Sequence, residues 1–247
     1  MPSTIELKIK RQDSPQGPAR WEEFSLPYRA NMNVISCLME IQRRPVNKAG
    51  KKTAPVVWEC SCLEEVCGAC TMLVNGRVRQ SCTALVDQLE QPIRLAPMTK
   101  YPIVRDLVVS RQKMFDSLIR VKAWVSLDGT HSMGPGPKIP PAVQQASYPF
   151  AQCMTCGCCT EACPQFNERS DFIGPAVIGQ VRLFNAHTAG KLNAEERLHA
   201  LMGRGGIAEC GNAQNCVEVC PKNIPLTEAI GRVGRQVTMQ MLRDLLG

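Results

Sequence analysis

The sequence predicts an α+β protein with a strand-rich N-terminal domain and an all-helical C-terminal domain. Apolar side chains alternate with period two near the N-terminus, whereas they recur at helical spacing in the last part of the chain. A Pro/Gly-rich stretch at 134–141 separates the two patterns. Because 247 residues suffice for two ordinary domains, we expect domains at 1–110 and 146–247 with a connector at 111–145.

The first predicted elements are two strands and a helix. Residues 4–10 alternate apolar and charged side chains, which predicts a half-buried strand, and 20–27 is the expected returning strand after a turn-rich loop. Apolar residues at helical spacing predict a helix over 33–43, with Asn33 as its cap.

Further strands surround a cysteine-rich loop. Residues 55–58 are expected to lead into the loop as a strand, and 92–97 to form the last strand. Between them, 72–78 predicts a hairpin, because Asn75-Gly76 is typical of a type I′ turn. Strands around one helix, with a cysteine loop beside it, are the arrangement of a plant-type ferredoxin β-grasp domain.

The remainder is expected to be helical. Residues 104–125 predict a helical connector. The C-terminal pattern, typical of a helical frame around bacterial-ferredoxin-like sites, predicts helices at 175–186, 193–202 and 225–246. Asn193 with Glu196 fits a capping box at the start of the second of these.

Eleven of the fourteen cysteines follow iron–sulfur ligand spacings. The first pattern is Cys-x4-Cys-x2-Cys followed by a more distant fourth cysteine, the plant-type spacing for a [2Fe–2S] cluster. Its members are Cys62, Cys67, Cys70 and Cys82. A structural zinc site built from two cysteine pairs is the alternative for this spacing.

Two further runs resemble bacterial ferredoxins in spacing. One is Cys-x2-Cys-x2-Cys-x3-Cys-Pro, too crowded for a single tetrahedral zinc, and the other is Cys-x5-Cys-x3-Cys-Pro near the C-terminus. In two-cluster ferredoxins the fourth cysteine of each run ligates the cluster of the other run. The expected [4Fe–4S] ligands are therefore Cys153, Cys156, Cys159 and Cys220, and those of the third site are Cys163, Cys210 and Cys216.

The third site lacks one cysteine. Ala213 stands where the last run should offer its second ligand, and alanine cannot bind iron. We therefore expect a [3Fe–4S] cluster; the alternative is a [4Fe–4S] cluster with water on its fourth iron. Of the surplus cysteines, Cys37 is expected to be a buried inert thiol and Cys158 a packing residue, while Cys60 is expected to be structural, with a spare ligand as the alternative.

Charge, residue composition and missing motifs argue against several classes of function. The net charge of +7 is offset by about −6 from loaded clusters, aromatic residues are scarce, and the basic stretch at 48–52 is expected to be a solvated loop, so nucleic-acid binding is not expected. No secretory signal or spanning segment is evident, and metal spacings argue against a secreted disulfide scaffold, which indicates the cytosol. No nucleophile–base pattern or dinucleotide-binding glycine motif is present, so a dehydrogenase partner is expected.

These motifs resemble one family over nearly the whole chain. The loop from Cys62 to Cys70, the run ending in Cys163-Pro164, and the run ending in Cys220-Pro221 are similar to the iron–sulfur subunit of succinate dehydrogenase and fumarate reductase. The resemblance implies a membrane-bound complex at the cytoplasmic face. An FAD flavoprotein oxidises succinate there, this subunit relays electrons through [2Fe–2S], [4Fe–4S] and [3Fe–4S], and a membrane anchor reduces quinone.

One departure from the family bears on the quinone. Ubiquinone-reducing members carry tryptophan shortly after the first Cys-Pro and histidine after the first cysteine of the last run. Here Gln165-Phe166 follows Pro164, and Gly211 follows Cys210. The resemblance therefore implies the menaquinone-reducing class with a cytochrome b anchor carrying haem b. Backbone N–H donors in the 62–70 loop, together with a buried subunit interface, are expected to raise the [2Fe–2S] potential above the about −400 mV of plant-type ferredoxins.

Three alternatives remain open at this stage. Fumarate reductase would use the same centres in the reverse direction. A free-standing ferredoxin-like carrier would serve several partners, although two joined domains favour a fixed subunit. A structural protein without redox activity is the third.

Overall fold

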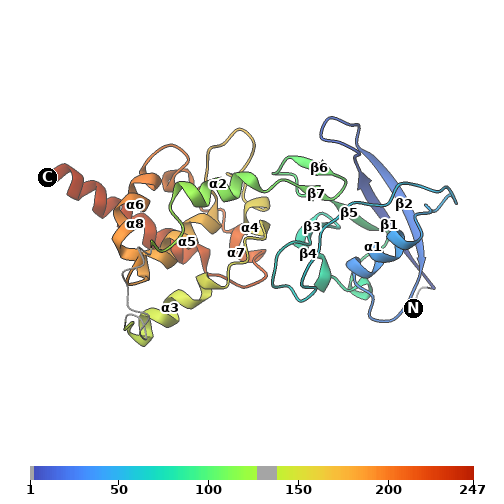
Figure 1. The fold of residues 1–247 in the computed structure, drawn as a ribbon, viewed down its shortest axis with the longest axis horizontal. Coiled ribbons are helices and arrows are strands. Elements are labelled where there is room, and N and C mark those ends of the chain that lie inside the picture. Colours follow the sequence, from blue (N-terminus) through green and yellow to red (C-terminus); the bar gives the residue numbers. More distant parts are fainter. Residues whose placement is uncertain (1–2, 127–137) are drawn as a thin grey trace. The chain divides into compact units, whose positions relative to one another are not determined.

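A computed structural model describes residues 3–126 and 138–247 (Figure 1). The Pro/Gly-rich residues 134–137 lie outside the described residues. The chain forms two compact units: Met1–Arg111 with Met154–Glu161, and Gln112–Cys153 with Ala162–Gly247. The compact units differ from the predicted domains in two segments: 154–161 groups with the β-rich unit, and the predicted connector groups with the helical unit from Gln112 on.

The first unit is a five-stranded mixed sheet that packs against one helix. Its strands are β1 (Thr4–Arg11), β2 (Arg20–Pro27), β3 (Thr71–Val74), β4 (Arg77–Gln80) and β5 (Ile93–Ala96). Their order is β2-β1-β5-β3-β4, with β1 and β5 parallel and the other pairs antiparallel. This confirms the strand–strand–helix start, the hairpin and the strand at 92–97.

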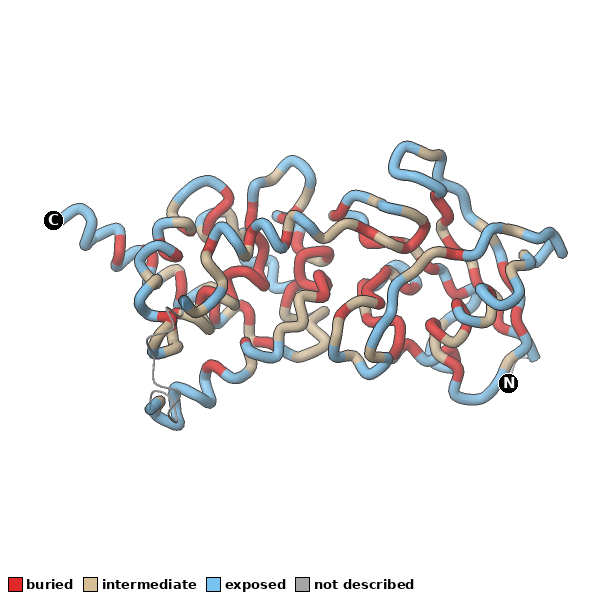
Figure 2. The backbone as a smooth tube through the Cα atoms, in the orientation of Figure 1, coloured by how far each residue is buried: buried red, intermediate tan, exposed pale blue. Residues whose placement is uncertain are grey.

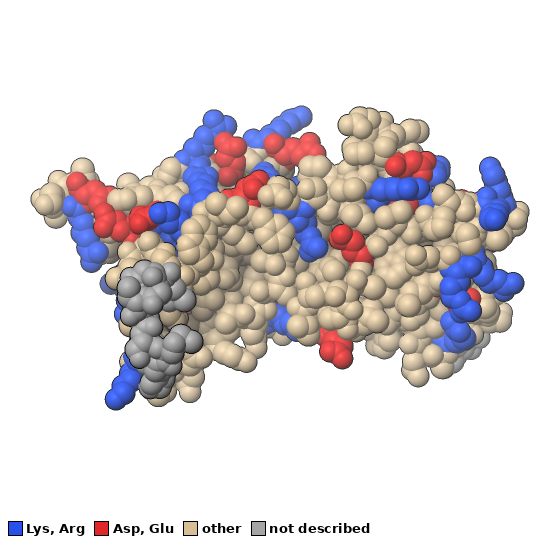
Figure 3. All heavy atoms as spheres, viewed as in Figure 1, with Lys and Arg blue, Asp and Glu red and all other residues tan. Residues whose placement is uncertain are grey.

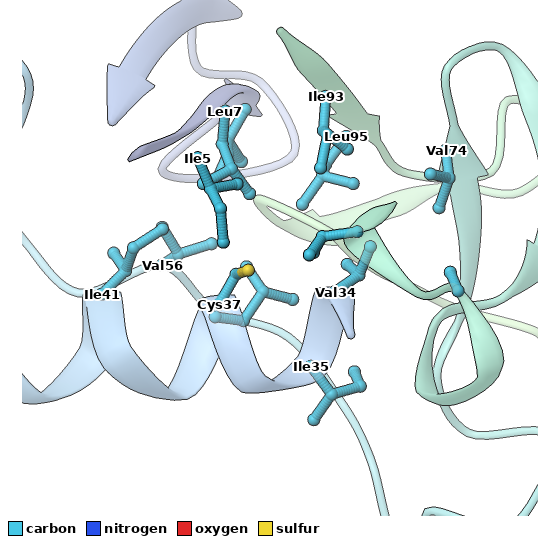
Figure 4. Packing of buried hydrophobic residues seen from close by; sticks show 14 of the residues in the cluster. Ile5, Leu7, Val34, Ile35, Cys37, Ile41, Val56, Val74, Ile93 and Leu95 are labelled. Atoms are coloured by element: carbon cyan, nitrogen blue, oxygen red, sulfur yellow. The ribbon is translucent and has the colours of Figure 1, made fainter. Parts of the chain in front are cut away.

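The core of this unit lies between the sheet and α1 (Val34–Arg43). Ile5 and Leu7 on β1 face Cys37 on α1, and Ile93 and Leu95 on β5 complete the layer (Figure 4). Side chains at alternate positions of β1 are buried, as its period-two pattern predicts. The hairpin turn has φ of 49° at Asn75 and 79° at Gly76, and positive φ at both central residues is the requirement of a type I′ turn.

Asn33 caps α1 as predicted. Its side-chain Oδ1 accepts from Ser36 N at 2.8 Å, and Ser36 Oγ accepts from Asn33 N at 3.5 Å, which completes a capping box. The Asn33 amide also donates to the carbonyl of Cys82 at 2.9 Å. The start of the helix is thereby tied to a predicted cluster ligand.

Residues 55–58 are not a strand, contrary to the sequence-based expectation. The N–H of Val57 donates to Asp106 Oδ2 at 2.9 Å, and its carbonyl accepts from Leu107 N at 3.1 Å, so neither group enters a ladder. Asp106 also binds the fully buried Arg11, with 3.0 Å between Nε and Oδ1. A distant carboxylate therefore determines the path of this segment.

The expected helix over 104–125 is much shorter in the structure. A small hairpin, β6 (Ile103–Arg105) and β7 (Val108–Val109), occupies its first part, so 92–97 is not the last strand. The turn needs Asp106 at φ 47°, which a helix excludes. The helix is confined to α2 (Gln112–Arg120).

The second unit is helical within its described residues. Its α-helices are α2, α3 (Pro141–Ala151), α5 (Pro175–Ala186), α6 (Ala194–Met202), α7 (Asn215–Glu218) and α8 (Leu226–Leu246). The three predicted C-terminal helices are confirmed within a residue at each end. One face of α8 is buried near its start, and its last turns are exposed (Figure 2).

The capping box predicted at Asn193 is wrong. Residues Gly190–Asn193 already form a 3-10 turn, so Asn193 has φ −106° and ψ 15° instead of the extended conformation of a cap. Its side chain makes no capping bond, and its amide donates to Glu196 Oε1 at 3.3 Å.

The surface is mixed in charge. On the face drawn in Figure 3, basic and acidic side chains often lie together. The basic stretch at 48–52 is exposed, as expected, and Lys48 pairs with Glu6 at 2.9 Å. Among residues 3–126 and 138–247, no helix has both the length and the apolar character needed to cross a bilayer.

Candidate iron–sulfur sites

The loop that carries the first cysteine pattern folds around its own sulfur atoms. Leu63, Glu65 and Gly68 have φ of 60°, 55° and 72°, so the chain turns back repeatedly over a short distance. These turns point successive backbone N–H groups toward Cys62 Sγ. The donors are Glu64 N at 3.4 Å, Val66 N at 3.3 Å and Cys67 N at 3.3 Å.

The other sulfurs of the loop are also contacted. Cys67 Sγ accepts from the N–H groups of Cys62 and Ala69, each at 3.5 Å, and the Cys70 thiol donates to Gln80 Oε1 at 3.5 Å. Cys82, on the short turn Ser81–Thr83, is buried together with Cys70. These contacts confirm the N–H donors expected from the sequence.

Two pKa values show how differently the sulfurs of the first cysteine pattern are surrounded. Backbone N–H groups of Glu64, Val66 and Cys67 lower the pKa of Cys62 to about 7. Burial is the main reason that the pKa of Cys82 rises to about 11, and the nearby Cys70 and Cys62 add to the rise. The four predicted [2Fe–2S] ligands therefore lie in one neighbourhood.

The surplus cysteines have distinct environments. Cys37 is fully buried in the core of the first unit, and burial raises the pKa of its thiol to about 12, which makes it an unreactive thiol. Cys60 is exposed beside the loop. The pKa of its thiol is raised, first by partial loss of contact with water and then by the nearby charges of Cys67, Cys82 and Cys62. Its expected structural role stays a prediction.

The segment 154–161 brings Cys156, Cys158 and Cys159 into the first unit. Its helix α4 (Cys158–Glu161) ends at Glu161, whose buried carboxylate accepts from Thr99 N at 2.9 Å, Thr99 Oγ1 at 2.7 Å and Lys100 N at 3.0 Å. Cys158 is fully buried and accepts from Gln80 Nε2 at 3.5 Å, as expected for a packing residue.

The remaining predicted [4Fe–4S] ligands belong to the second unit. Cys153 follows α3, and Cys220 Sγ accepts from Ile224 N at 3.4 Å ahead of α8. The predicted set is thus divided between the two units, and its assembly around one cluster stays a prediction.

The three cysteines of the third predicted site line one cavity within the second unit. Cys163, Cys210 and Cys216 surround it together with Ala213, Gln165 and Gly211. Burial raises the pKa of Cys216 to about 11, followed by the charges of Cys163 and Cys210. Among the described residues that line this cavity, no fourth cysteine is present.

Sequence reasoning missed four polar residues around these sites: Gln80, Arg111, Asn33 in its contact with Cys82, and Glu161. Arg111 Nη1 donates to the carbonyls of Gly68 at 3.0 Å and Cys156 at 3.4 Å. Gln80, Arg111 and Glu161 stand at no motif position, so no local pattern signals them, and the predicted capping role of Asn33 does not indicate its contact with Cys82.

The donor sets fit iron–sulfur groups. Cysteine thiolates are the soft ligands that such clusters use, and N–H···S bonds stabilise the negative charge on ligand sulfur. The first loop offers N–H donors to two of its sulfurs, and the cavity in the second unit is lined by three sulfurs with a non-ligating alanine.

Comparison with known proteins gives two domain matches. A family model described as a 2Fe-2S iron-sulfur cluster binding domain matches residues 6–116, and one described as a 4Fe-4S dicluster domain matches 149–224. The fold and these domains define an iron–sulfur electron-transfer protein that joins a plant-type and a bacterial-type ferredoxin domain.

Individual relatives specify the family. The chain is 58% identical to the succinate dehydrogenase iron–sulfur subunit of Bacillus subtilis, over 99% of this chain and 96% of that protein. It is 30% identical to the fumarate reductase iron–sulfur subunit of Wolinella succinogenes, over 71% of this chain and 75% of that protein. A chain of the Mycobacterium smegmatis Sdh1 complex in the apo form has the same fold, with a TM-score of 0.83 and 18% sequence identity. The match covers 97% of this chain and 98% of that chain.

The chain therefore belongs to the family of succinate dehydrogenase iron–sulfur subunits. The resemblance inferred from the cysteine motifs is confirmed. The activity is that of an electron-relaying subunit within an oxidoreductase.

Proposed function

We propose that this chain relays electrons within a succinate:menaquinone oxidoreductase through three clusters held by eleven cysteines. The [2Fe–2S] ligands are Cys62, Cys67, Cys70 and Cys82. The [4Fe–4S] ligands are Cys153, Cys156, Cys159 and Cys220. The [3Fe–4S] ligands are Cys163, Cys210 and Cys216.

The observation that carries this proposal is the cavity of the second unit. Three predicted ligands from two distant runs converge there, and Ala213 lies in the same lining. A methyl group cannot replace a thiolate as an iron ligand, so the donor set favours three irons over four. A [4Fe–4S] cluster with water on its fourth iron is the competing assignment.

Each bound cluster would supply one-electron chemistry, and the protein would hold and tune it. The N–H groups of the 62–70 loop donate hydrogen bonds to the ligand sulfur of Cys62, and so stabilise negative charge that water would otherwise stabilise. Cys70 and Cys82 are buried, which keeps water from that side of the site. Fewer water contacts and directed N–H groups are the means by which proteins adjust such potentials.

The proposed partners are an FAD flavoprotein on the [2Fe–2S] side and a cytochrome b anchor with haem b on the [3Fe–4S] side. The chain would dock peripherally on the cytoplasmic face of the membrane through its helical unit, with menaquinone bound by the anchor. Two contacts support this exit. A Cβ on Gly211 would lie 2.6 Å from Gln165 Nε2, so the Gln165 side chain occupies the space beside this position, and Phe166 is fully buried with Lys113 Nζ 4.6 Å from its ring centroid.

The relatives favour succinate oxidation as the direction. Identity is 58% to a succinate dehydrogenase subunit and 30% to a fumarate reductase subunit. Assays of the purified complex with succinate and a quinone, and with fumarate and a quinol, test this directly. Faster fumarate reduction would reverse the assignment.

EPR spectroscopy of the native complex tests the cluster types. The oxidised protein should give a low-field three-iron signal that disappears on mild reduction. Reduction should then reveal a [2Fe–2S] signal. Two four-iron signals without a three-iron signal would contradict the assignment based on Ala213.

Purification tests the partners. Gel filtration of detergent extract should yield this chain together with a flavoprotein and a haem protein whose b-type haem is reduced by succinate. Washing membranes with salt or alkali should release the chain with the flavoprotein and leave the haem behind. A chain that elutes alone would instead indicate a free-standing carrier.

A further inference from the structure

Two cysteine loops meet inside the first unit. Gly68, between the predicted ligands Cys67 and Cys70, packs directly on Cys156, and a Cβ added to Gly68 would lie 2.7 Å from Cys156 Cβ. No side chain fits that distance, and the φ of 72° at Gly68 independently favours glycine. The backbones of a predicted [2Fe–2S] loop and a predicted [4Fe–4S] loop are therefore in contact.

One cation bridges this contact. Arg111 Nη1 donates to the carbonyl of Gly68 at 3.0 Å and to that of Cys156 at 3.4 Å. Its side chain is 18% exposed, and Nη2 lies 3.8 Å from Glu59 Oε2, which is 48% exposed. A guanidinium carries one positive charge, and a partly buried charge is weakly screened by salt.

We propose that Arg111 is a positioning and tuning residue between the first two electron-transfer centres. Its two carbonyl contacts fix the separation of the loops, and its charge raises the reduction potentials of both centres. The reduced form of each centre carries one more electron, so a nearby cation stabilises it relative to the oxidised form. The negative charge of Glu59 opposes this effect. It offsets only part of it, because Glu59 is more exposed to water than Arg111 is and its charge is therefore more strongly screened. The inference rests on the proposed cluster assignments.

The test is a potentiometric EPR titration of the first two centres in the intact complex. Arg111→Gln should lower the reduction potential of both centres. The expected change in the ratio of reduced to oxidised centre is about tenfold, which corresponds to 59 mV for a one-electron couple. Arg111→Lys keeps the charge and should recover most of the shift. Glu59→Gln removes the opposing charge and should raise the potentials by less than Arg111→Gln lowers them.

A matched control is available in the second unit. Arg120 Nη2 also donates to two backbone carbonyls, those of Ala200 at 3.0 Å and Arg204 at 2.7 Å, and neither belongs to a cysteine loop. Arg120→Gln removes the same kind of guanidinium and should leave both potentials unchanged.

Opposite shifts in Arg111→Gln and Glu59→Gln support the proposal, because a structural defect has no reason to change sign with charge. Unchanged potentials in Arg111→Gln, or shifts of the same sign in both variants, overturn it. If Arg111→Gln does not assemble its clusters, Glu59→Gln decides: an upward shift supports the proposal and no shift overturns it. A wild-type complex without a [2Fe–2S] signal would refute the proposed function instead.

Discussion

The two units surround their cysteines in different ways. In the first unit, the 62–70 loop directs backbone N–H groups at its sulfurs and lowers the pKa of Cys62 to about 7. In the second unit, Cys216 lies in a cavity with Cys163 and Cys210, and burial raises its pKa to about 11. The 62–70 loop thus stabilises a thiolate at Cys62 by itself, whereas burial opposes thiolate formation at Cys216, as it does at Cys82 in the first unit.

This difference indicates what each site needs from its metal. The first loop already offers hydrogen-bond donors where a ligand charge will stand. The second gathers three sulfurs that repel one another when ionised, so its stability in the thiolate form depends on the positive charge of the iron core. We therefore expect the loss of one ligand to remove the first centre, and the number of cysteine ligands to determine the number of irons in the second.

The largest expected effect is the loss of a centre. Cys67→Ser replaces a soft thiolate by a poorer hydroxyl donor and should abolish or strongly alter the [2Fe–2S] EPR signal. Cys60→Ser is the matched control, since Cys60 is an exposed cysteine beside the same loop, and it should leave the signal intact. Equal damage from both would mean that the first ligand is misassigned.

Next in size is a change of cluster type in the second unit. Ala213→Cys places a thiol in the lining of the cavity and should convert the three-iron signal to a [4Fe–4S] signal with a lower potential. Ala213→Ser adds a group of similar size with a weaker ligand and should keep three irons. Conversion by serine as well would show that the cavity, not the missing thiolate, determines the cluster.

A smaller effect is expected from the contact between the two loops of the first unit. Gly68→Ala should destabilise the protein by about 1–2 kcal/mol from its positive φ, with a further cost from the clash at Cys156. Gly50→Ala is the control, because Gly50 also has a positive φ of 77° but nothing within 4 Å of an added Cβ. Thermal unfolding of the two variants measures the difference, and equal losses would mean that the contact is easily relaxed.

The smallest expected effect concerns the helix caps. Asn33→Ala removes the capping box of α1 and should cost about 1 kcal/mol, visible as faster hydrogen exchange over 34–43. Asn193→Ala removes no capping bond from α6 and should leave exchange over 194–202 unchanged. A similar acceleration in both helices would contradict the assignment of the cap to Asn33 alone.

Local patterns accounted for most elements of the fold. The alternation over 4–10, the Asn75-Gly76 turn and the helical periodicity of 175–186 each depend on neighbours in sequence, and all three are present in the structure. The cysteine spacings belong to the same category, because a cluster loop is a local structure. They were sufficient to identify the family.

Contacts between residues far apart in the sequence determined the features that sequence periodicity does not predict. Asp106 draws Val57 out of a strand across 49 positions, and Glu161 holds segment 154–161 to Thr99 across 62 positions. Arg111 lies between two cysteine loops without belonging to either motif. Each depends on a charged group that finds backbone partners far along the chain. The sequence by itself thus determined the kind of ligands and their spacing, whereas only the folded chain decided which charges and N–H groups surround them.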